Sequence, residues 1–167
     1  IAGQVGIIKS NNTLNIQQST QTGIINWNTF NVGTDATVNF QQPNSSSATL
    51  NRVMSSDASK IYGQLNANGQ VFLINPNGVL FGKNARVDVG GLVASTMNIR
   101  DQDFLSGSYE FNTQSSTGRV INEGELLGNY IAMLAPEVRN DGVVIARQGT
   151  VAMAAGQKVT LSIAGDL

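Results

Sequence analysis

The chain has 167 residues, of which 13% are charged, and a formal net charge of −1. This length is enough for one domain with a core, and the lack of a basic patch argues against nucleic-acid binding. His and Cys are both absent, which excludes imidazole-based catalysis, disulfides and His or thiolate metal sites, so we predict no metal and no other cofactor.

The first fifty residues are typical of short strands joined by polar loops. Apolar residues gather at Leu14–Ile16 and Gly23–Trp27, and Thr37–Phe40 alternates with the period of two expected of a strand. The polar segment Gln41–Ser47 carries little that could be buried. We expect strands and turns here rather than long helices.

Two later segments admit other structures. In SSDASKIYGQL (55–65), Ser55 or Ser56 could cap a short helix that ends at Gly63, although a tight β-turn fits almost as well. Asp101-Gln102-Asp103 is the densest acidic site. It lacks the glycine turn and the distal Glu of a calcium loop, so we expect a solvated loop there.

The tetrad Asn75-Pro76-Asn77-Gly78 lies between two apolar runs, in FLINPNGVLFG (72–82). Asn at the first position can accept a hydrogen bond from the turn backbone, Pro presets φ at the second, and Gly is favoured at the fourth position of a type I turn. A hairpin with Asn77-Gly78 at its tip is the alternative. We favour the turn because an Asp-Gly pair recurs in the repeat described next.

An internal repeat occupies the second half of the chain. NGVLFGKNARVDV (77–89) aligns without gaps with DGVVIARQGTVAM (141–153). A third copy, EGELLGNYIAM (123–133), fits if its middle is shortened by two residues: Ile131-Ala132-Met133 then matches Val151-Ala152-Met153. In this copy the pair Asn122 and Gly124 matches Asn140 and Gly142.

A short repeat of Asn/Asp-Gly followed by apolar residues is typical of a β-solenoid. Corners need residues that tolerate tight backbone conformations, so we assign Asn122, Gly124, Asn140 and Gly142 to corners. In ARVDV (85–89), Val87 is expected to face inward while its charged neighbours point out. An antiparallel sandwich with coincidental turn spacing is the alternative. The alternation breaks off at the last residues, so we expect the natural chain to continue.

The enzyme interpretation is weak. A solenoid can cleave polysaccharides with outward carboxylates and bases, and the candidates here are Glu110, Glu123, Glu125, Arg119 and Arg139. They flank turns rather than one sheet, as charges that solvate corners do. Residues 78–84 resemble a phosphate-binding loop only faintly, because the glycine spacing and the final Ser/Thr are wrong. We therefore predict no enzyme.

Three segments together resemble a known family: NWNTFNVG (26–33), LNRVMSS (50–56) and GQVFLINPNGVLFGKNARVDVGGLVAST (69–96). They are similar to the secretion domain of two-partner-secreted (TpsA) exoproteins, the haemagglutination-activity domain of filamentous haemagglutinin and the high-molecular-weight adhesins. INEGELLG, VRNDGVV and VAMAAGQKVTLSI resemble that family's later rungs. No separate Asn-Pro-Asn-Leu motif precedes the tetrad, which is typical of the shorter, adhesin-type branch.

The resemblance implies an all-β fold, a right-handed parallel β-helix with an N-terminal cap and extra-helical strands. It implies one domain over 1–167, with the cap in 1–50 and the rungs in 70–167, as a fragment of a larger exoprotein. Asn51, Arg52 and the tetrad would form its structural and secretion motif.

The same resemblance implies a function. The domain would target the exoprotein to a cognate outer-membrane TpsB transporter of the Omp85 type, recognised by the transporter's POTRA domains, and nucleate folding outside a Gram-negative cell. We expect a monomer without a small-molecule substrate, in a protein that is an adhesin overall. A domain that itself binds glycans, or a polysaccharide lyase, is the alternative.

Overall fold

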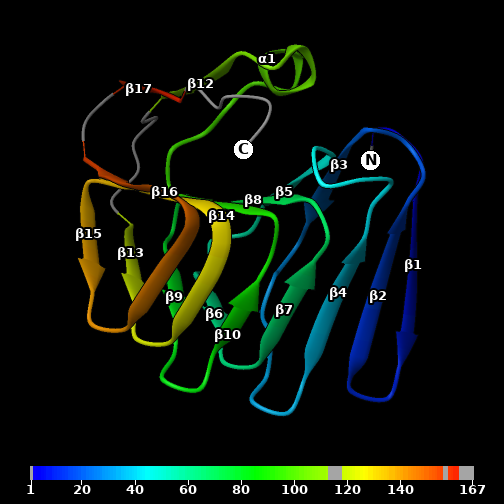
Figure 1. Cartoon of the computed structure of the whole chain (residues 1–167), viewed down its shortest axis with the longest axis horizontal. Helices are drawn as coiled ribbons and strands as arrows, with labels where there is room; N and C mark the ends of the chain where they lie inside the picture. The colour runs from blue at the N-terminus through cyan, green and yellow to red at the C-terminus, as the bar shows by residue number, and fades with distance from the viewer. Residues whose placement is uncertain (1, 113–117, 156–157, 162–167) are drawn as a thin grey trace.

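The chain coils into a solenoid of about 6 turns, with 61% of the described residues in strands and 4% in helix. The computed structural model describes residues 2–112, 118–155 and 158–161. Successive turns lie beside one another along the long axis, from the N-terminal strands at one end to the last long strand at the other (Figure 1). The prediction of a right-handed parallel β-helix is confirmed.

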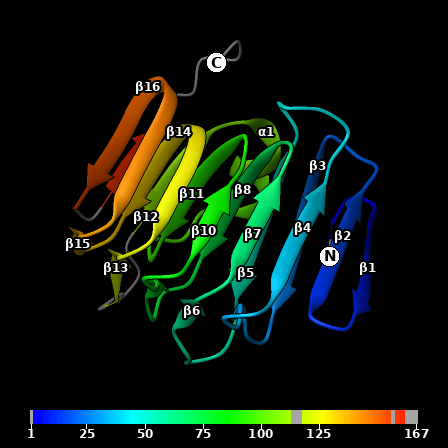
Figure 2. The ribbon, with the colours of Figure 1, turned by 60° about the horizontal axis from the view of Figure 1, so that its bottom comes forward.

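Each turn contributes parallel strands to up to three stacks, which form the sides of the solenoid (Figure 2). The first stack contains β2 (Thr13–Gln18), β4 (Thr37–Gln41), β7 (Gln64–Ala67) and β10 (Arg86–Asp88). The second stack contains β3 (Thr22–Trp27), β5 (Ala48–Val53), β8 (Gln70–Ile74) and β11 (Gly91–Ser95). The third stack contains β6 (Ser59–Ile61), β9 (Val79–Phe81), β13 (Arg119–Asn122) and β15 (Glu137–Asn140). The long strands β14 (Glu125–Leu134) and β16 (Val143–Ala154) run across both the first and the second stack.

The register places like residues above one another inside the solenoid. In the first stack the inward column contains Leu14, Val38, Leu65, Val87, Leu126 and Val144. Val87 is fully buried, whereas Arg86 is exposed, as the alternation in ARVDV predicts. Burial of such columns, at roughly 25 cal/mol per Å² of apolar surface, drives the stacking of the rungs.

The observed register agrees with one predicted repeat and corrects the other. Asn122 pairs with Asn140 and Ile131 pairs with Val151, which are the matches of the third copy. The separation along the chain is two residues longer for Ile131 and Val151 than for Asn122 and Asn140. The two additional residues lie in β16, at an irregularity in its pairing with β14 after Gly128. The ungapped match of 77–89 with 141–153 is wrong as a structural alignment.

The reason for that error is the position of the two segments in the rung. Val79 lies in the third stack and pairs with Val120, whereas Val143 lies in the first stack and pairs with Glu125. A strand that follows a tight corner carries the same Asn/Asp-Gly and apolar pattern on any side of the solenoid. Sequence similarity alone therefore cannot tell one corner of the rung from another.

At the N-terminal end, the chain runs antiparallel before it enters the stacks. β1 (Val5–Ser10) pairs antiparallel with β2, and Ala2 bridges Ile24 in the same sense. Parallel pairing begins at Thr13, within the range 1–50 that we predicted as a cap. We therefore propose residues 2–10 as the cap, because they cover the free edges of the first rung.

An excursion between β11 and β13 lies on the outer side of the second stack (Figures 1 and 2). It contains α1 (Asp101–Ser106) and β12 (Tyr109–Asn112), and β12 pairs antiparallel with β17 (Lys158–Leu161). A second apolar cluster fills the contact, in which Phe72 of β8 packs edge-on against Phe104 with ring centroids 5.2 Å apart. In the described part of the chain, no helix is long and apolar enough to cross a membrane.

The helix in the structure is not where the sequence suggested one. Ser55 and Ser56 form a bend, residues 57–58 are irregular, and Ser59–Ile61 is strand β6, so the alternative of a helix over 55–63 is wrong. Ser59 and Ile61 are buried in the third stack, and pairing with β9 outweighs the local capping signal. Asp101-Gln102-Asp103, predicted as a loop, is the first turn of α1.

Candidate functional site

The tetrad forms a corner between β8 and β9, which belong to different stacks. The Gly78 N–H donates to the Asn75 carbonyl at 3.0 Å, which closes a β-turn. The Asn75 Oδ1 accepts from the Asn77 N–H at 3.0 Å. A hairpin is excluded because β8 and β9 do not pair with one another.

Asn75 is completely buried and uses its whole side chain. Its Nδ2 donates to the Asp57 carbonyl and to the Ser59 Oγ, both at 2.9 Å. Its backbone N–H donates to the Ser95 carbonyl of the next rung at 2.9 Å. One asparagine thus joins the preceding loop, its own turn and the following rung.

Gly78 has no room for a side chain. Its φ is +122°, a conformation that L residues rarely adopt, and an added Cβ would lie 3.1 Å from the Arg119 carbonyl oxygen. Gly118 on the facing rung has even less room, because an added Cβ would lie 2.7 Å from the Pro76 carbonyl oxygen. The rungs therefore approach one another backbone to backbone at this corner.

The side chains of Asn51 and Arg52, consecutive residues of β5, make their contacts on opposite sides of the strand. Asn51 is fully buried; its Oδ1 accepts from the Trp27 Nε1 at 2.9 Å, and its Nδ2 donates to the Phe72 carbonyl at 3.2 Å. These bonds link three successive rungs of the second stack. Both polar ends of the asparagine are satisfied, as burial requires.

Arg52 holds the excursion against the solenoid. Its side chain is 14% exposed and forms an ion pair with Asp101 at 2.7 Å. It also donates to the Asn98 Oδ1 at 3.0 Å and to the Ile99 carbonyl at 2.5 Å. The planar fork of donors suits this clamp, because it bonds a carboxylate, an amide and a backbone carbonyl at once.

The predicted rung corners lie together at the ends of β13 and β15. The Asn122 Oδ1 accepts from the Gly124 N–H at 3.0 Å, and its Nδ2 donates to the Asn140 Oδ1 at 2.9 Å. The Asn140 Oδ1 in turn accepts from the Gly142 N–H at 3.2 Å. A Cβ on Gly142 would meet the Gly124 oxygen at 2.2 Å. This ladder lies at a different corner from the tetrad.

The carboxylates considered for catalysis do not converge. Glu110 pairs with Lys158 on the extra-helical sheet, and Glu125 lies 3.8 Å from Arg86 on the first stack. Arg119 and Arg139 have their own partners at the third stack: Glu137 at 3.8 Å and Asp141 at 2.7 Å. Among the described residues, no cluster of three or more acidic side chains could hold a metal ion.

Three groups among the described residues have shifted pKa values, and all three shifts lead away from neutrality. Burial raises the pKa of Tyr130, whose hydroxyl donates to the Gln70 Oε1 at 2.6 Å, and burial raises the pKa of Tyr109. A hydrogen bond to Asp103 raises the pKa of Arg100. All three groups move further from physiological pH, whereas catalytic groups are usually moved toward it.

Two features of the site were not predicted. A buried polar cluster lies at the corner between the first and second stacks and contains Gln18, Gln42 and Thr49. The Thr49 Oγ1 is hydrogen-bonded to both glutamines. Asn15, Asn39 and Asn66 stack in register on the outer side of the first stack. The signal for the second feature was the same residue type at intervals close to the rung length.

Together these features define a rigid β-solenoid whose asparagine and glycine residues fix its corners. A family model for the TPS secretion domain matches residues 2–166. The chain belongs to this family, the secretion domains of two-partner-secreted exoproteins. Such proteins are secreted, and the domain is a non-enzymatic targeting module.

Similar proteins come from Haemophilus influenzae. One heme/hemopexin-binding protein is 30% identical over 98% of this chain and 19% of its own length, and another is 37% identical over 74% and 14%. The crystal structure of the HMW1 secretion domain superposes with a TM-score of 0.90 at 33% identity, covering 96% of this chain and 44% of that one. The chain thus spans less than a fifth of the length of these curated relatives.

Proposed function

We propose that this domain directs a larger exoprotein to a cognate outer-membrane TpsB transporter of the Omp85 type. The transporter's periplasmic POTRA domains recognise the domain before it folds, and the solenoid forms outside the cell. Membership in the secretion-domain family is the observation that carries this proposal. We further propose a Gram-negative cell surface or the medium as the destination, and an adhesin as the whole protein.

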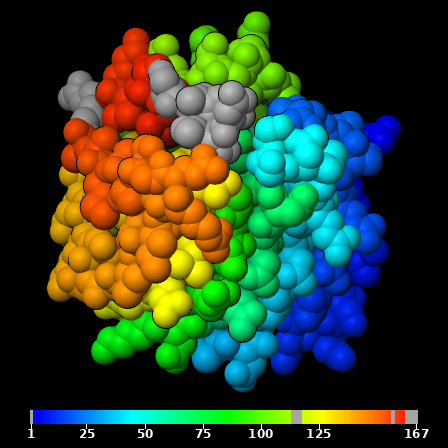
Figure 3. Space-filling model, in the orientation of Figure 1, coloured from blue at the N-terminus to red at the C-terminus, as the bar shows by residue number. Residues whose placement is uncertain are grey.

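The exposed end of the solenoid supports a role in nucleating further rungs. Ile131 and Met133 of β14 are fully buried, but Val151 and Met153, their partners in β16, are 43% and 46% exposed. Figure 3 shows the orange band of β16 open to solvent at this end. A preformed rung lowers the cost of adding the next one, because each rung contacts only its neighbours.

Binding to the isolated POTRA domains tests the recognition step. The 167-residue chain, diluted from denaturant so that it is still unfolded, is titrated with the POTRA fragment of a candidate cognate transporter. The POTRA fragment of a transporter from another two-partner system serves as the control. We expect saturable binding to the cognate fragment only. Equal binding to both fragments, or to neither, would contradict recognition by POTRA domains.

A further inference from the structure

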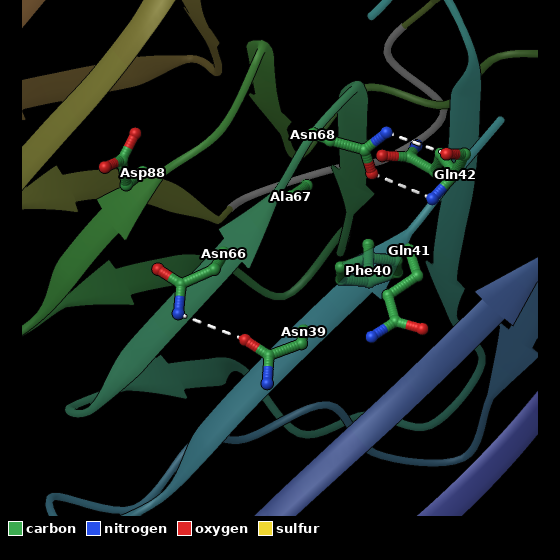
Figure 4. A pocket seen from close by; sticks show the side chains of 8 residues that line it. All are labelled: Asn39, Phe40, Gln41, Gln42, Asn66, Ala67, Asn68 and Asp88. Carbon is green, nitrogen blue, oxygen red and sulfur yellow. Dashed lines mark hydrogen bonds between the residues drawn. The ribbon is translucent and has the colours of Figure 1, made fainter. Parts of the chain in front are cut away.

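The outer side of the first stack carries a shallow groove that the secretion motif does not use (Figure 4). Its volume is about 590 Å³, and it crosses three successive rungs. It is lined by Asn39, Phe40, Gln41, Gln42, Asn66, Ala67, Asn68 and Asp88. The outer side of the second stack is covered by the excursion, whereas this groove lies open.

A row of three asparagines forms the floor of the groove and its extension, and we call Asn15, Asn39 and Asn66 the amide row. The Asn66 Nδ2 donates to the Asn39 Oδ1 at 3.1 Å, and the Asn39 Nδ2 donates to the Asn15 Oδ1 at 3.1 Å. These bonds fix the planes of the amides, and Asn39 and Asn66 each keep one further side-chain N–H that donates to none of the described residues. A ligand would therefore meet donors that are already oriented, which reduces the entropy cost of binding.

The amide row ends in a mismatch at the next rung. Asp88 is the register partner of Asn66, and an ionised carboxylate can only accept hydrogen bonds. The Asn66 amide nitrogen is turned toward Asn39, so its oxygen lies on the side of Asp88 (Figure 4). No described residue donates to that oxygen. Two acceptors thus adjoin on neighbouring rungs, and hydroxyl groups of a ligand could donate one hydrogen bond to each of them.

The remaining groups specify a neutral ligand. The charge of Asp88 is balanced by Arg147 at 2.9 Å and Arg86 at 3.5 Å. The exposed Gln41 side chain makes no hydrogen bond to the described residues and adds both a donor and an acceptor. Amides that donate and accept match hydroxyl groups, which do the same, better than they match a charged chain.

We propose that this groove binds a neutral, linear saccharide chain that runs along the solenoid axis. Neighbouring rungs are about 4.8 Å apart, so the row offers equivalent amides at a regular interval to a chain of repeating sugar units. One sugar hydroxyl donates to the Asn66 oxygen, and a second hydroxyl donates to the Asp88 carboxylate. Because the groove is shallow and Phe40 is buried beneath it, the affinity is weak, with a Kd on the order of 1 mM.

Titration of the ¹⁵N-labelled 167-residue chain tests this site. The probes are cellopentaose, xylopentaose, maltopentaose and chitopentaose, followed in the side-chain amide signals of Asn39, Gln41 and Asn66. We expect saturable shifts in these signals with at least one probe. Gln41→Ala and Asn66→Thr should each weaken binding about tenfold, whereas Asn12→Ala, at an exposed turn outside the groove, should leave it unchanged.

Gln41→Ala keeps the test decisive, because the exposed Gln41 side chain bonds to none of the described residues and its removal should leave the fold intact. A heparin-derived anionic pentasaccharide is the comparison for charge. The proposal is overturned if no neutral probe gives saturable shifts, or if Gln41→Ala binds as well as the parent. It is equally overturned if the anionic probe binds these side chains more tightly than every neutral one. None of these results depends on transporter recognition.

Discussion

Asn75 shows how much a single buried amide can hold in this fold. Asn75→Ala would leave the Ser59 hydroxyl, the Asp57 carbonyl and the Asn77 N–H without their partner. An unsatisfied buried group such as the Ser59 hydroxyl costs about 1–3 kcal/mol, and the two bonds to the exposed residues Asp57 and Asn77 add less because water can replace them. We therefore expect a loss of roughly 2–4 kcal/mol in the free energy of unfolding. Urea denaturation of the 167-residue chain measures it. Asn77→Ala, at an exposed position, is the control and should cost under about 1 kcal/mol; equal losses would contradict the central role of Asn75.

The neighbouring Gly78 is constrained by its backbone rather than by hydrogen bonds. Gly78→Ala or Gly78→Val forces a Cβ into a conformation with φ of +122° and against the Arg119 carbonyl. We expect a lower thermal midpoint and a loss of about 1–3 kcal/mol, larger for Val. Gly6→Ala is the matched control, because a Cβ there meets nothing within 4 Å. A Gly78→Val protein as stable as the parent would show that this corner tolerates change.

At the scale of elements, Arg52 decides whether the excursion stays on the solenoid. Arg52→Lys keeps the charge but cannot bond Asp101, Asn98 and the Ile99 carbonyl together. We expect residues 97–112 to be cut by protease at least several-fold faster, while amide exchange in the rungs changes little.

Arg86→Lys provides the control for Arg52→Lys. Arg86 is an exposed arginine whose carboxylate partners lie at 3.5 and 3.8 Å, and exposed pairs of this kind contribute little to stability. Its proteolysis should match the parent. If Arg52→Lys also matched the parent, packing of Phe104 against Phe72 would hold the excursion without the clamp.

Local pattern was sufficient to predict several elements but not their arrangement. The strands near Leu14 and Ile24 follow from clusters of apolar residues, and the strand near Val38 follows from alternation. The Asn122–Asn140 pairing follows from the repeat. The sequence does not predict which corner of the rung a given turn occupies, because the residues that permit a tight turn are the same on every side of the solenoid.

The excursion and the groove depend on contacts between distant residues. Arg52 meets Asp101 across 49 positions of sequence, and no local signal marks that pairing. Helix α1 has only six residues and no side-chain N-cap bond, so its apolar contact with Phe72 has to stabilise it. The three asparagines of the amide row recur at intervals close to the rung length, but their alignment depends on the register of the rungs.

For the whole molecule, we expect further rungs of the exoprotein to pack on β16, the last long strand of the solenoid. Val151→Asp should cost under about 1 kcal/mol in the 167-residue chain, where Val151 is 43% exposed. In a chain extended by further rungs of the exoprotein, the same change should cost at least ~2 kcal/mol, because the charge would be buried. Denaturant midpoints of the two lengths, each with and without the substitution, give the comparison. Equal costs would mean that no rung packs on β16.

Export from living cells tests whether this domain directs secretion through a cognate transporter. The chain is expressed with a periplasmic signal peptide in a Gram-negative host that carries the cognate transporter, an unrelated two-partner transporter, or neither. The fraction of the domain in the medium is then measured, with a periplasmic enzyme as the marker for leakage. We expect release only with the cognate transporter. Equal release from cells that lack it, or retention in cells that carry it, would contradict a role in secretion.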